Sequence, residues 1–336
     1  MEQADGSVMS KPADMPVQAE LAVARGDIKA SDATIVVATY DPERWPFLSA
    51  AVESLLSGSE RPSRVVVCVD QNEELYERVR LAWPEVTALL NSGDPGASGT
   101  RNAGAKYADT PFIVFLDDDV RVLEGWLSRL LAPLADPGVV GTGGGVVAGW
   151  QTGRPKWFPE EFDWVVGASF RGMPTVQSAV RNVWAENMAV RADVFRAVGG
   201  FRTDFGKVGN RNSPEDTDLC IRMAASLPQA TWVYAPDAVV EHHVPASRAS
   251  FSFFLRRSYN EGRGKVEMAD LLGRQAKLQD ERDYILRTLP AGILTGLRGV
   301  IRHGDLGGLL RAGAIVTGAF AAGIGATVRT RKHAGK

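Results

Sequence analysis

The sequence predicts an α/β fold in which a mostly parallel sheet is flanked by helices and followed by an α-helical C-terminal extension. Strand-like and helix-like segments alternate four times between about residues 33 and 120, the pattern of a doubly wound parallel sheet. Residues 112–116 form an uninterrupted apolar run between Pro111 and a group of acids, as expected of a strand buried on both faces. Beyond Ser250 only helical patterns remain.

The elements of the first half follow from local composition. The strands are short β-rich runs that end at turn formers or acids, and the helices show apolar residues three and four positions apart. In order, we expect strands at 33–39, 64–69, 86–90 and 112–116, and helices at 45–56, 73–83 and 100–108. In the second half, we expect helices at 122–134, 185–198 (in part) and 215–226, and strands at 139–147 and 231–234.

Composition narrows the class of protein. The chain has 336 residues, of which 45% are hydrophobic and 23% charged, enough to bury a substantial core. Its net charge of −2 gives no indication of nucleic-acid binding. Cys68 and Cys220 lie far apart in apolar runs, which favours buried free thiols over a disulfide framework or a zinc site. Glu2 and Asp5 and the lack of an apolar run argue against a signal peptide, so we expect a cytoplasmic protein.

Three consecutive acids, Asp117, Asp118 and Asp119, follow the apolar strand. Ligands of open α/β sheets collect at the carboxyl ends of the strands, and right-handed crossovers would bring Thr39 and Asp70 to the same edge. Carboxylates there suit Mg²⁺ or Mn²⁺, which bridge protein acids to substrate phosphates. The alternative is a solvated acidic loop after an ordinary strand, but the position of the cluster favours the metal site.

Two further features could contact a nucleotide. Asp70 ends a strand and could accept hydrogen bonds from a base or a ribose, or it could simply cap a helix. The glycine-rich stretch 96–104 would let the backbone approach a ligand, and its Arg101 offers a planar donor for phosphate. This stretch matches neither the P-loop nor the dinucleotide fingerprint, which disfavours ATPases and dinucleotide oxidoreductases.

Two more acidic or basic groups could act in catalysis. Glu215 and Asp216 open a helix, where acids are stabilised by the helix dipole or could serve as a general base toward a hydroxyl. His242 and His243 follow a strand-like segment, where a neutral imidazole could be a metal ligand or a structural side chain.

Taken together, these pieces resemble family 2 of the inverting glycosyltransferases, which have a GT-A fold with a Rossmann-like sheet. The motifs that carry the resemblance occur in the family's order between about residues 33 and 270: 35–40, 98–104, 115–119, 187–191 with 198–201, 215–216 and 240–245. Two motifs depart from the common pattern. Tyr40-Asp41-Pro42-Glu43-Arg44 replaces the usual Asn-Arg after Thr39, and Asp70-Gln71-Asn72-Glu73 replaces Asp-Gly-Ser.

The resemblance implies a role for each site residue. Asp119, Asp117 and His242 would hold Mn²⁺ or Mg²⁺ in a DxD-type site, with Asp119 the direct ligand. Asp216, with Glu215, would be the catalytic base. The nucleotide sugar, with a UDP-sugar favoured, would be bound by Thr39, Asp41, Asp70, Arg101, Asp117 and Asp118, and the acceptor by Trp184, Glu186 and Asn187.

The resemblance also implies an organisation of the chain. We expect a flexible leader at 1–31, a GT-A domain at 32–250 and a helical extension at 251–336. The nucleotide half of the domain would span about 32–120 and the acceptor half about 121–250. Residues 312–328 carry no charge and are followed by four basic residues, so this extension could span a membrane, lie on its surface or pack on the protein.

The expected activity is metal-dependent transfer of a hexose from a nucleotide diphosphate sugar to a hydroxyl of a saccharide or a lipid-linked acceptor in cell-envelope polysaccharide or glycan synthesis. Peripheral contact with the cytoplasmic face of the plasma membrane would place the enzyme beside such an acceptor. Two alternatives remain: a sugar-nucleotide nucleotidyltransferase, and a non-catalytic scaffold recruited to a membrane. A nucleotidyltransferase would normally have a glycine-rich loop directly after its first strand, and a scaffold would be expected to have lost the acids.

Overall fold

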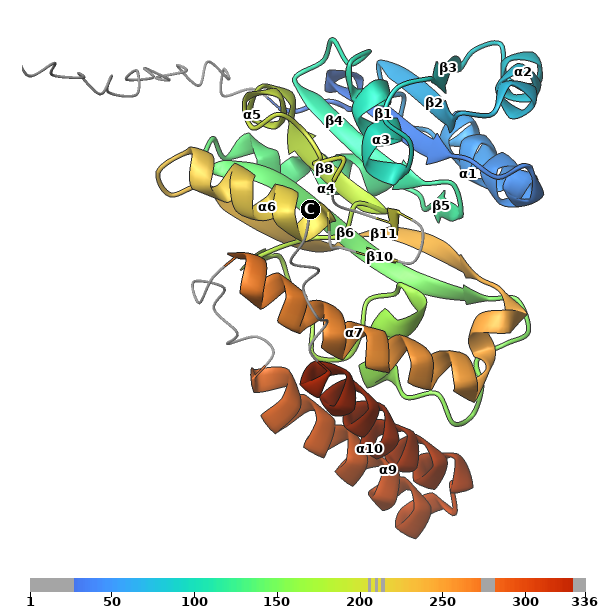
Figure 1. Ribbon diagram of the computed structural model, residues 1–336, viewed down its shortest axis with the longest axis vertical. Coiled ribbons are helices and arrows are strands. Elements are labelled where there is room, and N and C mark those ends of the chain that lie inside the picture. The colour runs from blue at the N-terminus through green and yellow to red at the C-terminus, as the bar shows by residue number, and fades with distance from the viewer. Residues whose placement is uncertain (1–26, 205–206, 209–210, 213–214, 273–281, 329–336) are drawn as a thin grey trace, which may run out of the picture.

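The computed structural model describes residues 27–204, 207–208, 211–212, 215–272 and 282–328, so most of the leader expected at 1–31 lies outside it. One large sheet runs through the molecule in the order β3-β2-β1-β4-β8-β6-β11-β5, and β7 pairs with β11 (Figure 1). Its first four strands are parallel: β1 (Ala33–Thr39), β2 (Arg64–Asp70), β3 (Thr87–Asn91) and β4 (Phe112–Asp117).

The second half of the sheet departs from the expected parallel arrangement. Its strands are β5 (Val120–Val122), β6 (Val139–Trp150), β7 (Ser178–Val180), β8 (Asn187–Arg191) and β11 (Thr231–Val244). β6 and β11 are parallel to each other, but β8 is antiparallel to both β4 and β6, and β5 and β7 are antiparallel to β11. The α/β sheet flanked by helices is confirmed, while parallel pairing dominates only in the nucleotide half.

Helices cover both faces of this sheet. On one face α1 (Trp45–Ser57), α2 (Glu73–Ala82) and α4 (Trp126–Leu131) share a core with the strands, as Leu48, Leu75 and Leu127 illustrate. On the other face lie α3 (Ala97–Ala105), α5 (Ala192–Ala197) and α6 (Glu215–Ser226), whose Ala105, Phe195 and Leu219 join a second core. The remaining short elements are β9 (Lys207–Val208), β10 (Arg211–Asn212) and the 3₁₀ turns 30–32, 42–44, 132–135, 160–166 and 246–249.

Two predicted helical segments of the second half begin later than expected. The helix expected at 122–134 begins only at Trp126, because residues 120–122 pair with β11 as an edge strand. The segment 185–198 is partly helical, as predicted: strand β8, buried between β4 and β6, is followed by α5. At the start of each segment, pairing within the sheet outweighs helical spacing.

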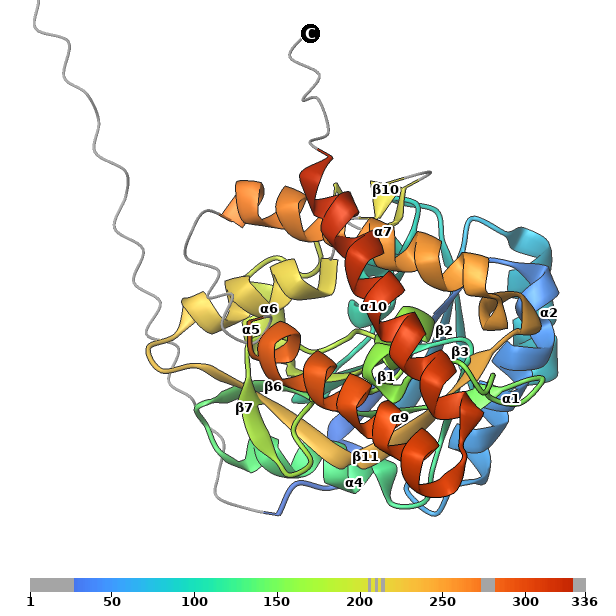
Figure 2. The ribbon, with the colours of Figure 1, turned by 90° about the horizontal axis from the view of Figure 1, so that it is seen from below.

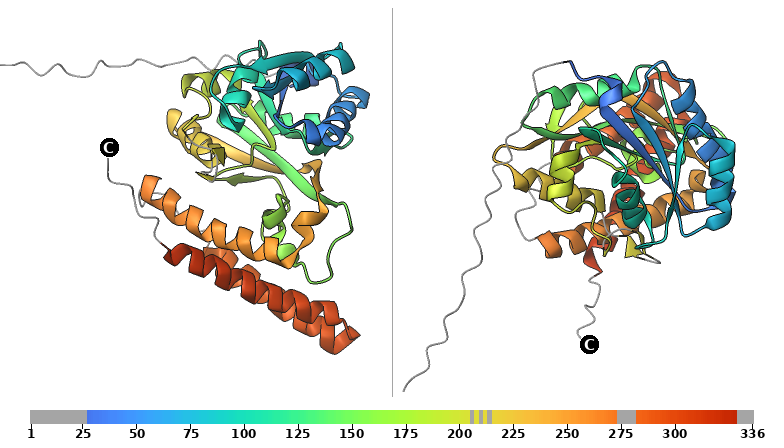
Figure 3. Two further views of the ribbon diagram at one scale, coloured as in Figure 1. Left: turned by 45° about the vertical axis from the view of Figure 1, so that its right-hand side comes forward. Right: turned by 90° about the horizontal axis from the view of Figure 1, so that it is seen from above.

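The C-terminal extension is helical, as predicted, and forms a separate layer below the sheet. It consists of α7 (Phe251–Leu272), a π-helical turn (Tyr284–Thr288), α9 (Leu289–His303) and α10 (Leu306–Thr327), and α10 lies beside both α7 and α9 (Figures 2 and 3). Glycines allow this close packing: a Cβ on Gly262 would lie 1.9 Å from the carbonyl oxygen of Ala322. Phe162 and Phe254 anchor the layer in a third core.

Candidate active site

The predicted site residues lie at the carboxyl edge of the parallel strands. Thr39, Asp70 and Asp117 end β1, β2 and β4, and the register pairs Thr39 with Val69 and Ala38 with Asp117. The parallel pairing therefore brings the three strand ends to one edge, as the sequence predicted.

Asp118 and Asp119 both pair with Arg44, a residue that was not among the predicted site residues. The Arg44 guanidinium lies 2.5 Å from Oδ1 of Asp118 and 2.8 Å from Oδ2 of Asp119. Thr39 also donates a hydrogen bond of 2.6 Å to Asp118. Both carboxylates are buried, whereas the Arg44 side chain is 23% exposed. Burial raises the pKa of Asp118, an effect that the charge and hydrogen bonds of Arg44 oppose.

In the sequence, what pointed to a role for Arg44 was its position shortly after the first strand, where the common pattern has Asn-Arg. The turn 42–44 carries it back over the acids, and Asp41 starts that turn by accepting a hydrogen bond from the Glu43 amide. Asp41 therefore caps this turn, and its backbone carbonyl accepts a hydrogen bond of 3.0 Å from the Arg44 amide.

A second arginine joins the two acidic motifs. Arg101, on α3, lies 2.6 Å from Asp117 and 3.2 Å from Glu215, and it is 5% exposed. Its Nε atom has no hydrogen-bond partner among the described residues. Asp117 and Glu215, at the start of α6, are about 100 residues apart in the sequence, and Arg101 connects their carboxylates in the fold.

His242 occupies the other side of Asp119. Its Nε2 atom lies 3.3 Å from Oδ2 of Asp119 and 3.5 Å from Arg248. Burial alone would lower the pKa of His242, but the hydrogen bond to Asp119 and the charge of Glu186 raise it to about 9. His243 instead stacks on Phe47 at 4.1 Å between ring centroids, so only His242 faces the acids.

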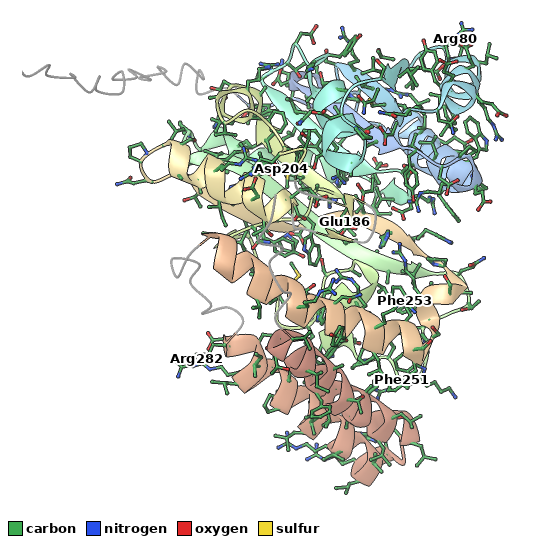
Figure 4. The ribbon with its side chains drawn as sticks, in the orientation of Figure 1. Arg80, Glu186, Asp204, Phe251, Phe253 and Arg282 are labelled. Atoms are coloured by element: carbon green, nitrogen blue, oxygen red, sulfur yellow. The ribbon has the colours of Figure 1, made fainter. Side chains whose placement is uncertain are left out.

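Two carboxyl groups beside these residues have strongly raised pKa values. Burial and then the Glu215 charge raise the pKa of Asp216 to about 7. Burial, opposed by His242 and aided by Asp117 and Asp119, raises the pKa of Glu186 to about 8. Glu186 lies centrally in the molecule, between the sheet and α7 (Figure 4). Perturbed carboxyls gathered at one edge are typical of a catalytic site.

The residues fit a divalent cation in their chemistry, but the cation would have to compete with Arg44. Within the described ranges, no three acidic, histidine or cysteine side chains stand close enough to hold a metal ion. Asp119 nevertheless offers an oxygen beside His242, and the buried Nδ1 of His242 has no partner among the described residues. A metal bound to Asp119 would replace part of the contact that this carboxylate makes with Arg44.

Other predicted residues have structural partners. Asp70 accepts hydrogen bonds of 2.9 Å from Asn91 and 2.8 Å from the Gly96 amide, and thereby fixes the glycine-rich loop. Asn187 is 1% exposed; its Oδ1 atom accepts a hydrogen bond from the Trp126 indole on α4, and its Nδ2 atom donates to the carbonyls of Gly145 and Ala238 in the sheet. These contacts do not support the predicted contact of Asn187 with the acceptor. Trp184 is half-buried and packs on Phe170.

Comparison with known proteins places this arrangement in a family. Residues 34–199 match the family model "Glycosyl transferase family 2". A glucosyl-dolichyl phosphate glucuronosyltransferase from Haloferax volcanii is 30% identical over 87% of this chain and 94% of its own. The succinoglycan biosynthesis protein ExoM from Rhizobium meliloti is 28% identical over 68% of this chain and 72% of its own.

A solved structure supports the fold. The mannosyltransferase PcManGT from Pyrobaculum calidifontis, determined with GDP-Man and Mn²⁺, superimposes with a TM-score of 0.54. The match covers 87% of this chain and 86% of the other at 16% identity. The GT-A fold predicted from the sequence is thereby confirmed.

Proposed function

Because the chain belongs to family 2 of the glycosyltransferases and has a GT-A fold, we propose that it transfers a hexose from a nucleotide diphosphate sugar, with a UDP-sugar favoured, to an acceptor hydroxyl with inversion at the anomeric carbon. The observation that carries this proposal is Asp216. It stands at the N-terminal end of α6, is linked to the DxD acids through Glu215 and Arg101, and has a pKa of about 7. A carboxyl group with this pKa can accept a proton at neutral pH.

In the proposed reaction, Asp216 takes the proton of the acceptor hydroxyl while the oxygen of that hydroxyl forms a bond to the anomeric carbon. The bond from that carbon to the diphosphate oxygen breaks at the same time, so the nucleoside diphosphate leaves from the opposite face. Arg101 pairs with both Glu215 and Asp117, and this contact would position the catalytic base Asp216 relative to the donor. Transfer in a single displacement needs no covalent intermediate and inverts the configuration.

Asp119, Asp117 and His242 would hold Mn²⁺ or Mg²⁺, which would neutralise charge on the departing diphosphate. A metal-bound His242 must be neutral, so binding would release the proton that Asp119 and Glu186 now favour. Thr39 and Arg44 orient Asp118, and Asp70 fixes the loop that would approach the nucleotide. Trp184 and Glu186 would face the acceptor.

The C-terminal helices suggest that the acceptor is lipid-linked. Apart from Ile315, the buried residues of α10 are glycines and alanines such as Gly308 and Ala312. Most of its large apolar side chains, among them Leu306 and Phe320, are exposed. Leu306 and Phe320 are 71% and 70% exposed. Helix α10 is also long and apolar enough to cross a membrane by composition, although it packs on α7 and α9.

This distribution favours an apolar environment for the outer face of α9 and α10, which we call the hairpin face. Its large apolar residues are Leu294, Leu297, Ile301, Leu306, Leu309, Leu310, Val316, Phe320 and Ile324, and Arg298 and Arg302 flank it on α9. Apolar side chains beside arginines suit a peripheral position at an anionic membrane surface. We therefore propose that the enzyme works at the cytoplasmic face of the plasma membrane, in glycan or envelope polysaccharide synthesis.

The test is a panel of nucleotide sugars incubated with the full chain and Mn²⁺ or Mg²⁺. We expect metal-dependent release of nucleoside diphosphate from one donor class, and a product of inverted anomeric configuration by NMR. An Asp119→Asn variant should release no diphosphate while keeping its far-UV circular dichroism spectrum. Retention of configuration would exclude the single displacement, and unchanged activity of Asp119→Asn would remove the metal role.

A further inference from the structure

One loop connects the acidic site to the hairpin helices. At Gly167, where φ is +74°, an added Cβ would lie 2.9 Å from the His242 ring and 3.4 Å from Oε2 of Glu186. At Gly172, where φ is +112°, a Cβ would lie 2.9 Å from the hydroxyl oxygen of Thr288, just before α9. The loop therefore contacts the active site at one end and the C-terminal layer at the other.

Three half-buried rings follow the same course, and we call Trp184, Phe170 and Tyr284 the aromatic row. Phe170 lies in the middle of the loop, 6.4 Å from the Trp184 ring and 5.4 Å from the Tyr284 ring between centroids. Trp184 is two residues from Glu186, and Tyr284 belongs to the turn that leads into α9. Figure 4 labels Glu186, which is two residues after Trp184, and Arg282, which is two residues before Tyr284.

Two hydrogen bonds hold the Tyr284 ring in place. The Tyr284 hydroxyl donates a hydrogen bond of 2.6 Å to the Glu161 carbonyl, and the Trp164 indole donates one of 3.0 Å to the Tyr284 oxygen. Phe170 meets Tyr284 nearly edge-on, at 81° between planes. All three residues of the aromatic row are partly rather than fully buried.

We propose that the aromatic row binds the sugar of a lipid-linked acceptor between the hairpin face and Asp216. The proposal rests on the proposed function above. A sugar ring has C–H faces that pack on aromatic faces and hydroxyls that stay free at its rim. The row begins at the layer where the lipid would lie and ends beside Glu186, so it would position the acceptor hydroxyl without touching the donor.

The experiment compares Phe170→Leu, which removes a ring of the row, with Phe170→Tyr, which keeps it, in the full chain. The acceptor probe is a citronellyl phosphate that carries glucose, and methyl glucoside is the lipid-free probe. The donor is the nucleotide sugar that the wild type hydrolyses fastest. Tyr107→Leu, at a ring that is 45% exposed near α3, serves as the matched control.

We expect Phe170→Leu to raise the KM for the citronellyl probe about three- to tenfold, as for the loss of one aromatic contact. Donor hydrolysis, the donor KM and vesicle binding should not change, and Phe170→Tyr and Tyr107→Leu should behave like the wild type. If Phe170→Leu fails to fold, Tyr284→Leu against Tyr284→Phe makes the same comparison.

Three results would overturn the proposal: an unchanged acceptor KM in the ring-deleted variant, an equal change in donor hydrolysis, or a wild type that uses methyl glucoside as well as the citronellyl probe. A wild type that hydrolyses its donor yet transfers to neither probe would overturn it as well. Failure of the wild type to release diphosphate from any donor would instead refute the underlying function.

Discussion

Arg44 offers the sharpest test of how the acidic site is held together. Replacing it by alanine leaves Asp118 and Asp119 buried without their shared cation. Removing one partner of a buried ion pair typically costs about 3–5 kcal/mol. We expect the low end, about 3 kcal/mol at pH 7, because Arg44 is 23% exposed and His242 still faces Asp119.

The assay is urea unfolding followed by tryptophan fluorescence. The loss should shrink as the pH falls toward 5, because burial already raises the pKa of Asp118 and the unpaired carboxyl can take up a proton. Arg80→Ala is the control, because its pair with Glu77 is exposed to solvent on α2 and should contribute little to stability.

The same variant tests the metal site. If a divalent cation takes the place of the guanidinium, MnCl₂ at a hundredfold excess over its Kd should stabilise Arg44→Ala by about 2.7 kcal/mol, and the same MnCl₂ concentration should stabilise the wild type less. A variant as stable as Arg80→Ala would refute the assigned role of Arg44. A variant that gains nothing from Mn²⁺ would refute competition between guanidinium and metal.

The remaining predictions concern the base, the titrating carboxyls and the hairpin face. Asp216→Asn should lower kcat about a thousandfold with little change in donor affinity. The wild-type rate should rise with pH through about pH 7, and this rise should be absent from the variant. A rise that persists in the variant would point to another base. Glu186 holds its proton up to about pH 8 in the folded chain, so stability should fall as the pH rises from 4.5 to 8, and Glu186→Gln should flatten this part of a plot of melting temperature against pH. The raised pKa of His242 acts in the same direction, since its contribution is complete below pH 6.5 and is lost as the pH rises through about 9. Phe320→Glu should weaken binding to anionic vesicles about tenfold, whereas Leu81→Glu, at an equally exposed position on α2, should not; equal binding by both variants would argue against the hairpin face.

The sequence by itself determined the strands of the nucleotide half and the edge where the acids gather. Continuous apolar runs such as 112–116 are typical of strands buried on both faces of a sheet, and parallel strands such as β1 and β4 bring their carboxyl ends together whatever the loops do. Asp117 was therefore marked by its place at the end of such a run, whereas Glu215 and His242 were assigned roles through the resemblance to the family. The helical nature of the C-terminal extension followed in the same way from local periodicity.

Only the tertiary structure decided which partner each of these residues has. Asn187 has the polar character of a ligand-binding side chain, but sheet pairing turns it inward to Trp126. Arg44 looked like part of a divergent loop until the turn after β1 placed it on Asp118 and Asp119. The outward face of α10 was equally hidden, because small residues pack closely against α7 and leave the large side chains outside. Long-range contacts of this kind depend on three-dimensional distance, which local spacing in the sequence does not encode.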